Sequence, residues 1–183
     1  MKIIRFHALP SAALPVPPFS LHADSSLLLP GRPLFMPEEQ AAWVARPHVA
    51  VRIGRLGKNI ALRFLPRYRD AISLALHITS ADASSVAPAL VALRDLSDAS
   101  IVLGSWSDSL PSSIVIADTP ADLSPILSVV DPLIAAISER TTLKTGDIFL
   151  FPIPDRSIPL APGHIEIPPA ISRRVYTSAA ADD

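Results

Sequence analysis

The stretch Arg52–Ser84, RIGRLGKNIALRFLPRYRDAISLALHITSADAS, decides the fold of this chain. The β-branched run Val49–Ile53 leads into it as a strand, and the glycines of the segment 54–60 are typical of the turn and return of a hairpin. Farther along, Ala71–Thr79 alternates in character with the period of two that a strand requires. Its two sides are Ile72, Leu74, Leu76 and Ile78 against Ser73, Ala75, His77 and Thr79. The alternation predicts a strand that carries His77 on its smaller, more polar face.

The remaining segments predict a mainly β chain with a few short helices. Further strands are expected at Lys2–Phe6, Ile101–Leu103, Ile114–Ile116, Ile148–Phe151 and Ile165–Ile167, with short apolar pieces at 26–29 and 34–36. Residues 9–19 contain four prolines and are expected to be extended or looped. Helices are expected at 38–45, 84–96 and 131–139, the last with Asp131 as its N-cap. Twenty prolines in 183 residues exclude an all-helical bundle.

Length and composition limit the organisation of the chain and its partners. A length of 183 residues predicts one domain, taken as 1–176, followed by a flexible tail at 177–183. Charged residues make up only 18% and apolar residues 49%, which predicts a surface that pairs as a homodimer. A formal net charge of -1 argues against binding to nucleic acid or anionic lipid. The chain shows neither an export signal nor an apolar window long enough to span a membrane, so a cytoplasmic location without membrane contact is expected.

A set of short motifs gives the sequence a specific resemblance. In the central stretch these are LGKNI at 56–60, RF at 63–64, RYRD at 67–70 and TSAD at 79–82. Upstream lies SSLLLPGRPLFMP at 25–37, and downstream lie LIAAISERTTLKTGDIFLFPIP at 133–154 and LAPGHIEI at 160–167. Together they resemble the fumarylacetoacetate hydrolase family. The resemblance implies a mixed β-sandwich or roll, and a metal-dependent hydrolysis or decarboxylation of acylpyruvates and related β-dicarbonyl acids.

The same resemblance implies that the catalytic groups of the family are missing. Family members hold magnesium or manganese with a Glu-x-Glu pair and an Asp on the next strand, because hard cations prefer oxygen ligands. The register that GKNI sets places these three positions on Arg46, His48 and His77. The family's N-terminal His-Glu pair falls in a region occupied here by Pro10, Pro15, Pro17 and Pro18. The chain is thus expected to be a degenerate member, a pseudoenzyme with no metal or other cofactor.

Several interpretations of Arg46, His48 and His77 remain open. They can be ordinary residues on a filled pocket, or they can form an anion site that holds a small carboxylate or phosphate through charge-assisted bonds. Such a site is expected to bind more tightly as the histidines gain protons near their reference pKa of about 6.5. Zinc held by the histidines ranks third, because the arginine repels a cation. The competing functions are an active metal-dependent hydrolase or decarboxylase with relocated ligands, and a protein-interaction scaffold.

Overall fold

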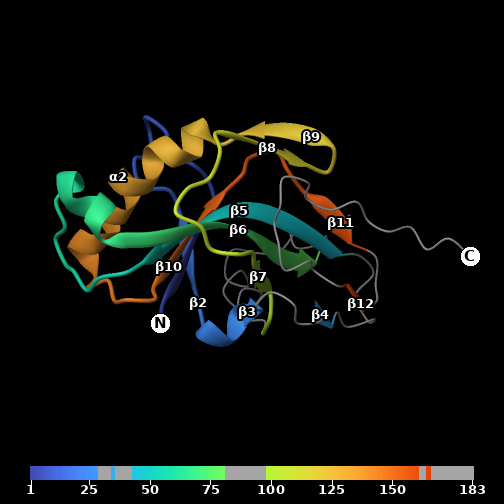
Figure 1. Cartoon of the computed structure of the whole chain (residues 1–183), viewed down its shortest axis with the longest axis horizontal. Helices are drawn as coiled ribbons and strands as arrows, with labels where there is room; N and C mark the ends of the chain where they lie inside the picture. Colours follow the sequence, from blue (N-terminus) through green and yellow to red (C-terminus); the bar gives the residue numbers. More distant parts are fainter. Residues whose placement is uncertain (29–33, 36–42, 81–97, 161–163, 166–183) are drawn as a thin grey trace, which may run out of the picture.

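A long antiparallel pair, β5 (Trp43–Ile53) and β6 (Arg69–Ser80), forms the centre of the molecule (Figure 1). The computed structural model describes residues 1–28, 34–35, 43–80, 98–160 and 164–165. Within this part, eight strands form one mixed sheet in the order β2-β1-β10-β5-β6-β7-β3, and β11 pairs with β5 as well. The other strands of the sheet are β1 (Ile3–Phe6), β2 (Phe19–His22), β3 (Leu27–Leu28), β7 (Ile101–Leu103), β10 (Ile148–Pro152) and β11 (Ile158–Leu160). The chain is therefore mainly β, as its sequence predicts.

Smaller elements surround this sheet. Two strand pairs lie outside it: β4 (Leu34–Phe35) with β12 (His164–Ile165), and β8 (Ser113–Ile116) with β9 (Thr119–Asp122). The described helices are two short 3-10 turns, η1 (Asp24–Ser26) and η2 (Leu62–Arg67), and the α-helix α2 (Ser124–Arg140). None of these helices is long and apolar enough to cross a membrane. The predicted helix at 84–96 and the predicted tail at 177–183 lie outside the described residues.

One face of the sheet packs on α2 and the β8–β9 hairpin, which lie on the same side of β5 in Figure 1. Alternate residues of β1, β5, β6 and β10 supply the sheet's side of this core, among them Phe6, Val49, Val51, Phe149 and Phe151. α2 contributes Ile126, Val130, Leu133, Ile134 and Ile137, whose spacing puts them on one stripe of a helix. Burial of this stripe stabilises the helix against the one proline in its interior, Pro132.

The structure corrects where α2 begins. Sequence reasoning placed Asp131 at the N-cap, but the helix begins at Ser124, where Asp122 Oδ1 accepts the backbone N–H of Ser124 at 2.9 Å. Asp131 lies in the helix interior, and its Oδ1 accepts a hydrogen bond from Arg69 Nε at 3.0 Å. The apolar stripe starts at Ile126, before the Asp-Pro pair, so packing on the sheet extends the helix toward its N-terminus.

Two further predictions near the central pair were wrong. Residues 43–45 were predicted to be helical, yet they begin β5, because β6 and β11 flank them and supply ladder partners on both sides. The segment 54–60 does not return along β5 as a hairpin. Gly57 exchanges two backbone bonds with Leu143, and Asn59 N–H donates to the carbonyl of Ser138, so the loop pairs with the end of α2 and the turn after it. The return strand is β6, which starts at Arg69, after η2.

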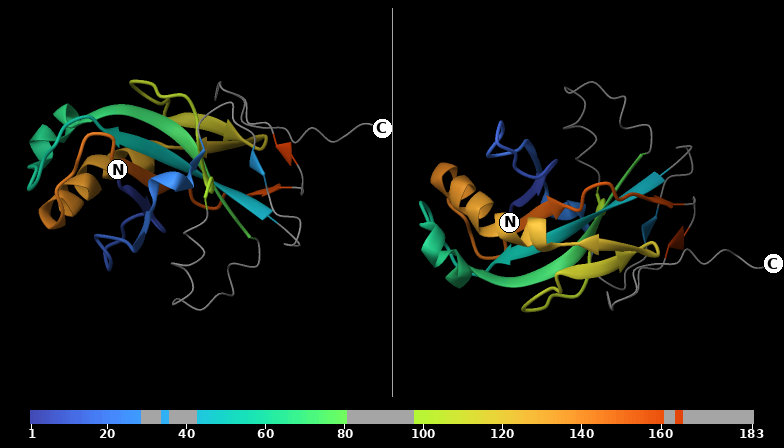
Figure 2. Two further views of the ribbon diagram at one scale, coloured as in Figure 1. Left: turned by 90° about the horizontal axis from the view of Figure 1, so that it is seen from below. Right: turned by 90° about the horizontal axis from the view of Figure 1, so that it is seen from above.

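The other face of the sheet is curled into a concave surface. Neighbouring strands lie about 4.8 Å apart, so β2 and β6, four steps apart in the strand order, would be separated by about 19 Å in a flat sheet. Instead, the ring centroids of His22 on β2 and His77 on β6 are 5.5 Å apart. The bend of β5 and β6 along their length is visible in Figure 2. This rolling brings side chains from distant strands together.

Candidate functional site

The three residues singled out from the sequence meet on the concave face. Arg46 and His77 are directly opposite each other in the β5–β6 ladder, and His48 lies two residues along β5, so all three side chains emerge on one face. The rings of His48 and His77 are 6.2 Å apart and nearly perpendicular. His48 and His77 are buried, at 1% and 2% exposure, whereas Arg46 is exposed. The prediction that these positions cluster agrees with the register.

The sequence reasoning missed a group of residues from the first two strands. Arg5 is buried on β1, and its Nε donates to His22 Nε2 at 3.2 Å. Ser20 Oγ lies 3.0 Å from the same nitrogen and 3.1 Å from Nε2 of His7. One signal in the sequence could have indicated Arg5. It is the charged residue of the otherwise apolar run IIRF, and a charged residue is unusual in a buried strand. Its neighbours could not be read from the sequence, because they depend on the rolling of the sheet.

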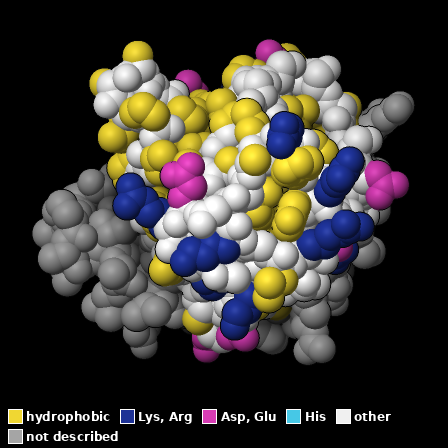
Figure 3. All heavy atoms as spheres, turned by 90° about the vertical axis from the view of Figure 1, so that its left-hand side faces the viewer, with side chains coloured by type: hydrophobic (Ala, Val, Ile, Leu, Met, Phe, Trp, Pro, Cys, Tyr) yellow, Lys and Arg dark blue, Asp and Glu magenta, His cyan; other side chains and the backbone are white. Residues whose placement is uncertain are grey.

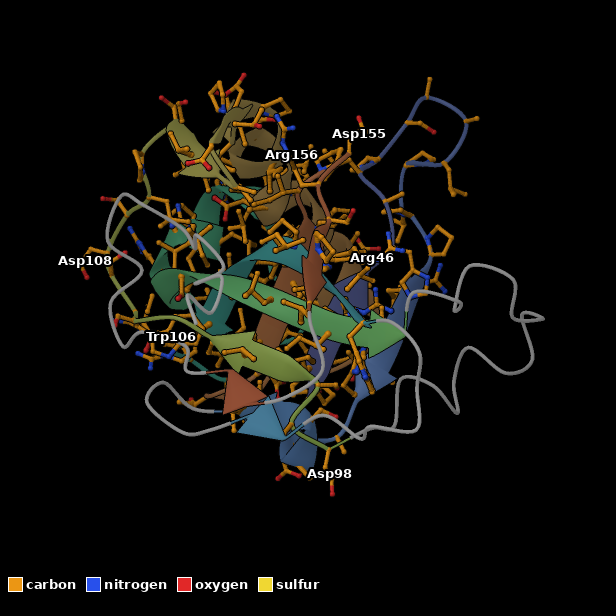
Figure 4. All side chains as sticks on the ribbon, turned by 90° about the vertical axis from the view of Figure 1, so that its right-hand side faces the viewer. Arg46, Asp98, Trp106, Asp108, Asp155 and Arg156 are labelled. Atoms are coloured by element: carbon orange, nitrogen blue, oxygen red, sulfur yellow. The ribbon has the colours of Figure 1, made fainter. Side chains whose placement is uncertain are left out.

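A cavity of about 500 Å³ opens beside Arg5, Arg46 and His48. Its lining comes from the end of β1 (residues 5–7), from β5 (residues 46–48) and from residues 152–157. His77 is not part of this lining, although its ring lies 6.2 Å from that of His48. In Figure 4, Asp155 and Arg156 lie above Arg46 in the connection between β10 and β11. The cavity volume is in the range of small-molecule sites.

Positive groups dominate this cavity. Arg5 is at its inner side, Arg46 is at its exposed side, and Arg46 makes no ion pair within the part of the chain that the structure describes. Arg156 also lines the cavity and is anchored through a 2.7 Å hydrogen bond from its guanidinium to the carbonyl of Pro120. Asp155 is the one carboxylate among the lining residues, and it is exposed. The arrangement favours an anionic ligand over a cation.

The charge state of His48 differs from what the sequence suggested. Burial, followed by the charges of Arg5, His22 and Arg46, lowers the pKa of His48 from 6.5 to about 3, although a hydrogen bond to the carbonyl of Arg46 acts in the opposite direction. The expectation that His48 becomes charged near pH 6.5 is therefore wrong. Sequence reasoning applied the pKa of a solvated imidazole, whereas this ring is desolvated next to cations. His48 is neutral at physiological pH.

The side chains of Arg46, His48 and His77 do not fit magnesium or manganese. Hard cations need several oxygen ligands, whereas these three residues offer a guanidinium and two imidazoles. The buried guanidinium of Arg5 lowers the pKa of His48, which shows that the local field opposes added positive charge. In the described ranges, no three His, Cys, Asp or Glu side chains are arranged to hold a metal ion.

Two segments next to the cavity, residues 7–18 and residues 152–154, are each held by a backbone hydrogen bond. Residues 7–18 form a loop that joins β1 to β2 and is closed by a 2.9 Å bond from His7 N–H to the carbonyl of Pro18. This confirms the looped conformation predicted for the proline-rich segment. On the other side, Ile153 N–H donates to the carbonyl of Pro47 at 3.0 Å, which fixes the Pro-Ile-Pro segment 152–154 at the cavity wall. Three prolines of the cavity lining, Pro47, Pro152 and Pro154, restrict the backbone of its wall.

A second hollow lies on a different face. It measures about 340 Å³ and is lined by Arg55, Leu56, Phe64, Arg67 and Tyr68. Figure 3 shows Lys and Arg side chains scattered between hydrophobic ones on the side of the molecule that carries η2. Leu56 is 69% exposed, and the guanidinium groups of Arg63 and Arg67 lie over the ring of Phe64. The expected homodimer stays a prediction.

The rolled mixed sheet, with its long helix on the outer face, defines the class of protein: the chain has the fold of the fumarylacetoacetate hydrolase-like proteins. No protein-family model matches the sequence, and a search of curated proteins finds no significant match. Solved structures match across most of the chain. At sequence identities below 25%, this likeness concerns the fold.

Three solved structures illustrate the likeness. The fumarylpyruvate hydrolase from Pseudomonas aeruginosa, solved with Mn2+ and pyruvate, is 14% identical with a TM-score of 0.70, and the match covers 90% of this chain and 82% of that one. The 2-hydroxyhepta-2,4-diene-1,7-dioate isomerase from Mycobacterium marinum is 17% identical with a TM-score of 0.75, covering 89% and 67%. A protein from Yersinia pestis CO92, provisionally assigned to the fumarylacetoacetate hydrolase family, is 17% identical with a TM-score of 0.67, covering 89% and 85%.

Proposed function

We propose that this protein keeps the fumarylacetoacetate hydrolase-like fold without metal-dependent catalysis, and that it binds a small carboxylate or phosphate in the cavity between β1, β5 and residues 152–157. The observation that carries the proposal is the convergence of Arg5 and Arg46 on a cavity of about 500 Å³. The family resemblance places a metal-binding carboxylate at the position of Arg46. Guanidinium groups bind carboxylates and phosphates through paired, charge-assisted hydrogen bonds.

Electrostatics supports an anion over a cation. Burial is the largest cause of the low pKa of His48, and the charges of Arg5, His22 and Arg46 also lower it. The positive field of these groups disfavours a metal ion as it disfavours a proton on His48. The same field attracts an anion. Arg5 is only 6% exposed, so its interaction with a bound ligand is less weakened by water than that of a surface arginine.

Catalysis by the reaction of the family requires a Lewis acid for the enolate and a base that activates water. The residues of this cavity do not fit a metal as the Lewis acid, because His48 lies beside Arg5 and Arg46. They do not fit the base either, because the N-terminal segment, where the family has its His-Glu pair, is a proline loop. We therefore propose a binding protein, a pseudoenzyme of this fold.

The test is calorimetric titration with inorganic phosphate and with citrate at low ionic strength. Arg46→Gln should weaken binding about tenfold, the loss expected for one charge-assisted contact of about 1.5 kcal/mol. Arg63→Gln is the matched control, since Arg63 is an exposed arginine that stacks on Phe64 outside the cavity lining. Equal binding by both variants, or no binding by the wild type, would refute the anion site.

A second assay tests the loss of catalysis. The purified protein is incubated with acetylpyruvate or oxaloacetate and either magnesium or manganese, and loss of ultraviolet absorbance is followed. We expect turnover no faster than with metal alone, and no rise in melting temperature on addition of either metal. Turnover above the metal blank that His48→Ala abolishes would favour the hydrolase with relocated ligands.

A further inference from the structure

His48 presents one satisfied and one unsatisfied nitrogen. Its Nδ1 lies 2.8 Å from the carbonyl oxygen of Arg46, and because a carbonyl can only accept, Nδ1 carries the hydrogen. The other ring nitrogen, Nε2, is buried and has no hydrogen-bond partner within the described residues. The backbone of β5 thus sets the tautomer and leaves an acceptor lone pair on the distal nitrogen of a residue that lines the cavity.

The surroundings keep this lone pair available. Burial and the neighbouring cations Arg5 and Arg46, together with His22, hold the pKa of His48 at about 3, so Nε2 is unprotonated at neutral pH. A buried acceptor is costly until a donor reaches it. The arginines beside it offer only donors. The site therefore combines cationic donors for an anion with one neutral acceptor.

We propose that the cavity selects an anion carrying its own hydroxyl donor, such as a 2-hydroxy carboxylate or a phosphate with a P–OH group, over an anion of the same size with acceptors alone. The anionic oxygens contact Arg46 and Arg5, and the hydroxyl donates to Nε2 of His48. A keto acid or sulfate places a lone pair against the lone pair of Nε2, which is repulsive. This inference rests on the proposed anion site and adds the chemistry of its ligand.

Two isosteric ligand pairs test the selection. At pH 7.5, phosphate carries a hydroxyl and sulfate carries none; 2-hydroxyglutarate differs from 2-oxoglutarate in the same way. We expect the hydroxyl-bearing member of at least one pair to bind at least tenfold more tightly, because a site built to accept a hydrogen bond rejects the analogue that cannot donate one. The phosphate pair and the acid pair separate the two possible sources of this chemistry.

Variants at position 48 connect the preference to Nε2. His48→Asn keeps an amide N–H near Nδ1 for the carbonyl of Arg46 but has no atom at Nε2, and it should bind both members of the preferred pair alike. His48→Gln can offer its amide oxygen near the position of Nε2 and should retain the preference. Circular dichroism and thermal unfolding check that both variants fold. Should either fail to fold, the wild-type ligand pairs decide the question alone.

Proton uptake distinguishes the competing account, in which the bound anion charges His48. Calorimetric titrations in buffers of different ionisation enthalpy should give the same enthalpy of binding. The ligand's own hydroxyl is the donor to His48, so no proton is taken from the buffer. Equal affinity within both pairs, or uptake of about one proton on binding, would overturn the hydroxyl selection and leave the anion site standing. Absence of binding by every ligand would refute both.

Discussion

Removal of the Asp147 carboxylate should strongly destabilise the protein. This side chain is fully buried, and it accepts the backbone N–H of Lys2 at 2.7 Å and that of Lys144 at 2.8 Å, while Nζ of Lys2 lies 2.6 Å from its Oδ2. It joins the start of β1 to the turn before β10, which are 145 residues apart and begin the parallel pair of the sheet. The bond from Lys144 N–H, together with the 3.0 Å bond from Asp147 N–H to the carbonyl of Lys144, also closes the turn before β10.

The expected magnitude follows from these contacts. Asp147→Ala leaves two backbone donors without their acceptor and removes the carboxylate from the Lys2 ammonium, which keeps the carbonyl of Thr142. Loss of one partner of a buried charge pair costs about 3–5 kcal/mol. Domains have only about 5–15 kcal/mol of stability in total. Asp70→Ala is the control, because Asp70 pairs with Arg52 through two bonds of 2.9 and 3.1 Å at an exposed site. There we expect about 0–1 kcal/mol.

Urea unfolding followed by circular dichroism measures both variants, and linear extrapolation gives the free energies of unfolding. The slopes with urea should be the same in both variants, so that the midpoints report stability. A loss for Asp147→Ala no greater than that for Asp70→Ala would refute the assignment of the buried carboxylate as the link between the start of β1 and the turn before β10.

Three further outcomes are expected. Because the pKa of His48 is about 3 in the folded chain and 6.5 when solvated, the unfolded chain takes up the proton first, and the free energy of unfolding should fall as the pH drops from 6.5 toward 3. Urea titrations at pH 7 and pH 5 should show a smaller fall for His48→Gln than for the wild type, and equal falls would contradict this. Ile134→Ala should cost about 2–5 kcal/mol, since Ile134 is fully buried under the sheet, whereas the exposed Val115→Ala should stay within about 0.5 kcal/mol. Light scattering should return a dimer mass at micromolar concentration, and a monomer mass would count against the homodimer.

The candidate site could be read only in part from the sequence. The family resemblance predicted that Arg46, His48 and His77 lie on adjacent strands facing one pocket, and the β5–β6 ladder has all three on one face. Arg5 and the cavity it lines were missed, since β1 reaches β5 only through β10, which lies more than a hundred residues later in the chain. Pairing between strands that are far apart in the chain cannot be predicted from local sequence patterns.

The sequence by itself determined that the chain is mainly β and where several strands lie. The family resemblance added the prediction that Arg46, His48 and His77 stand where a metal-binding family has acids. These properties are local or come from motifs, so they need no knowledge of the packing. Only the tertiary structure decided where α2 begins, which residues share the cavity with Arg46, and that His48 stays neutral. The helix boundary depends on burial of an apolar stripe, the cavity on the rolling of the sheet, and the pKa on desolvation next to Arg5, and each of these arises between residues far apart in the chain.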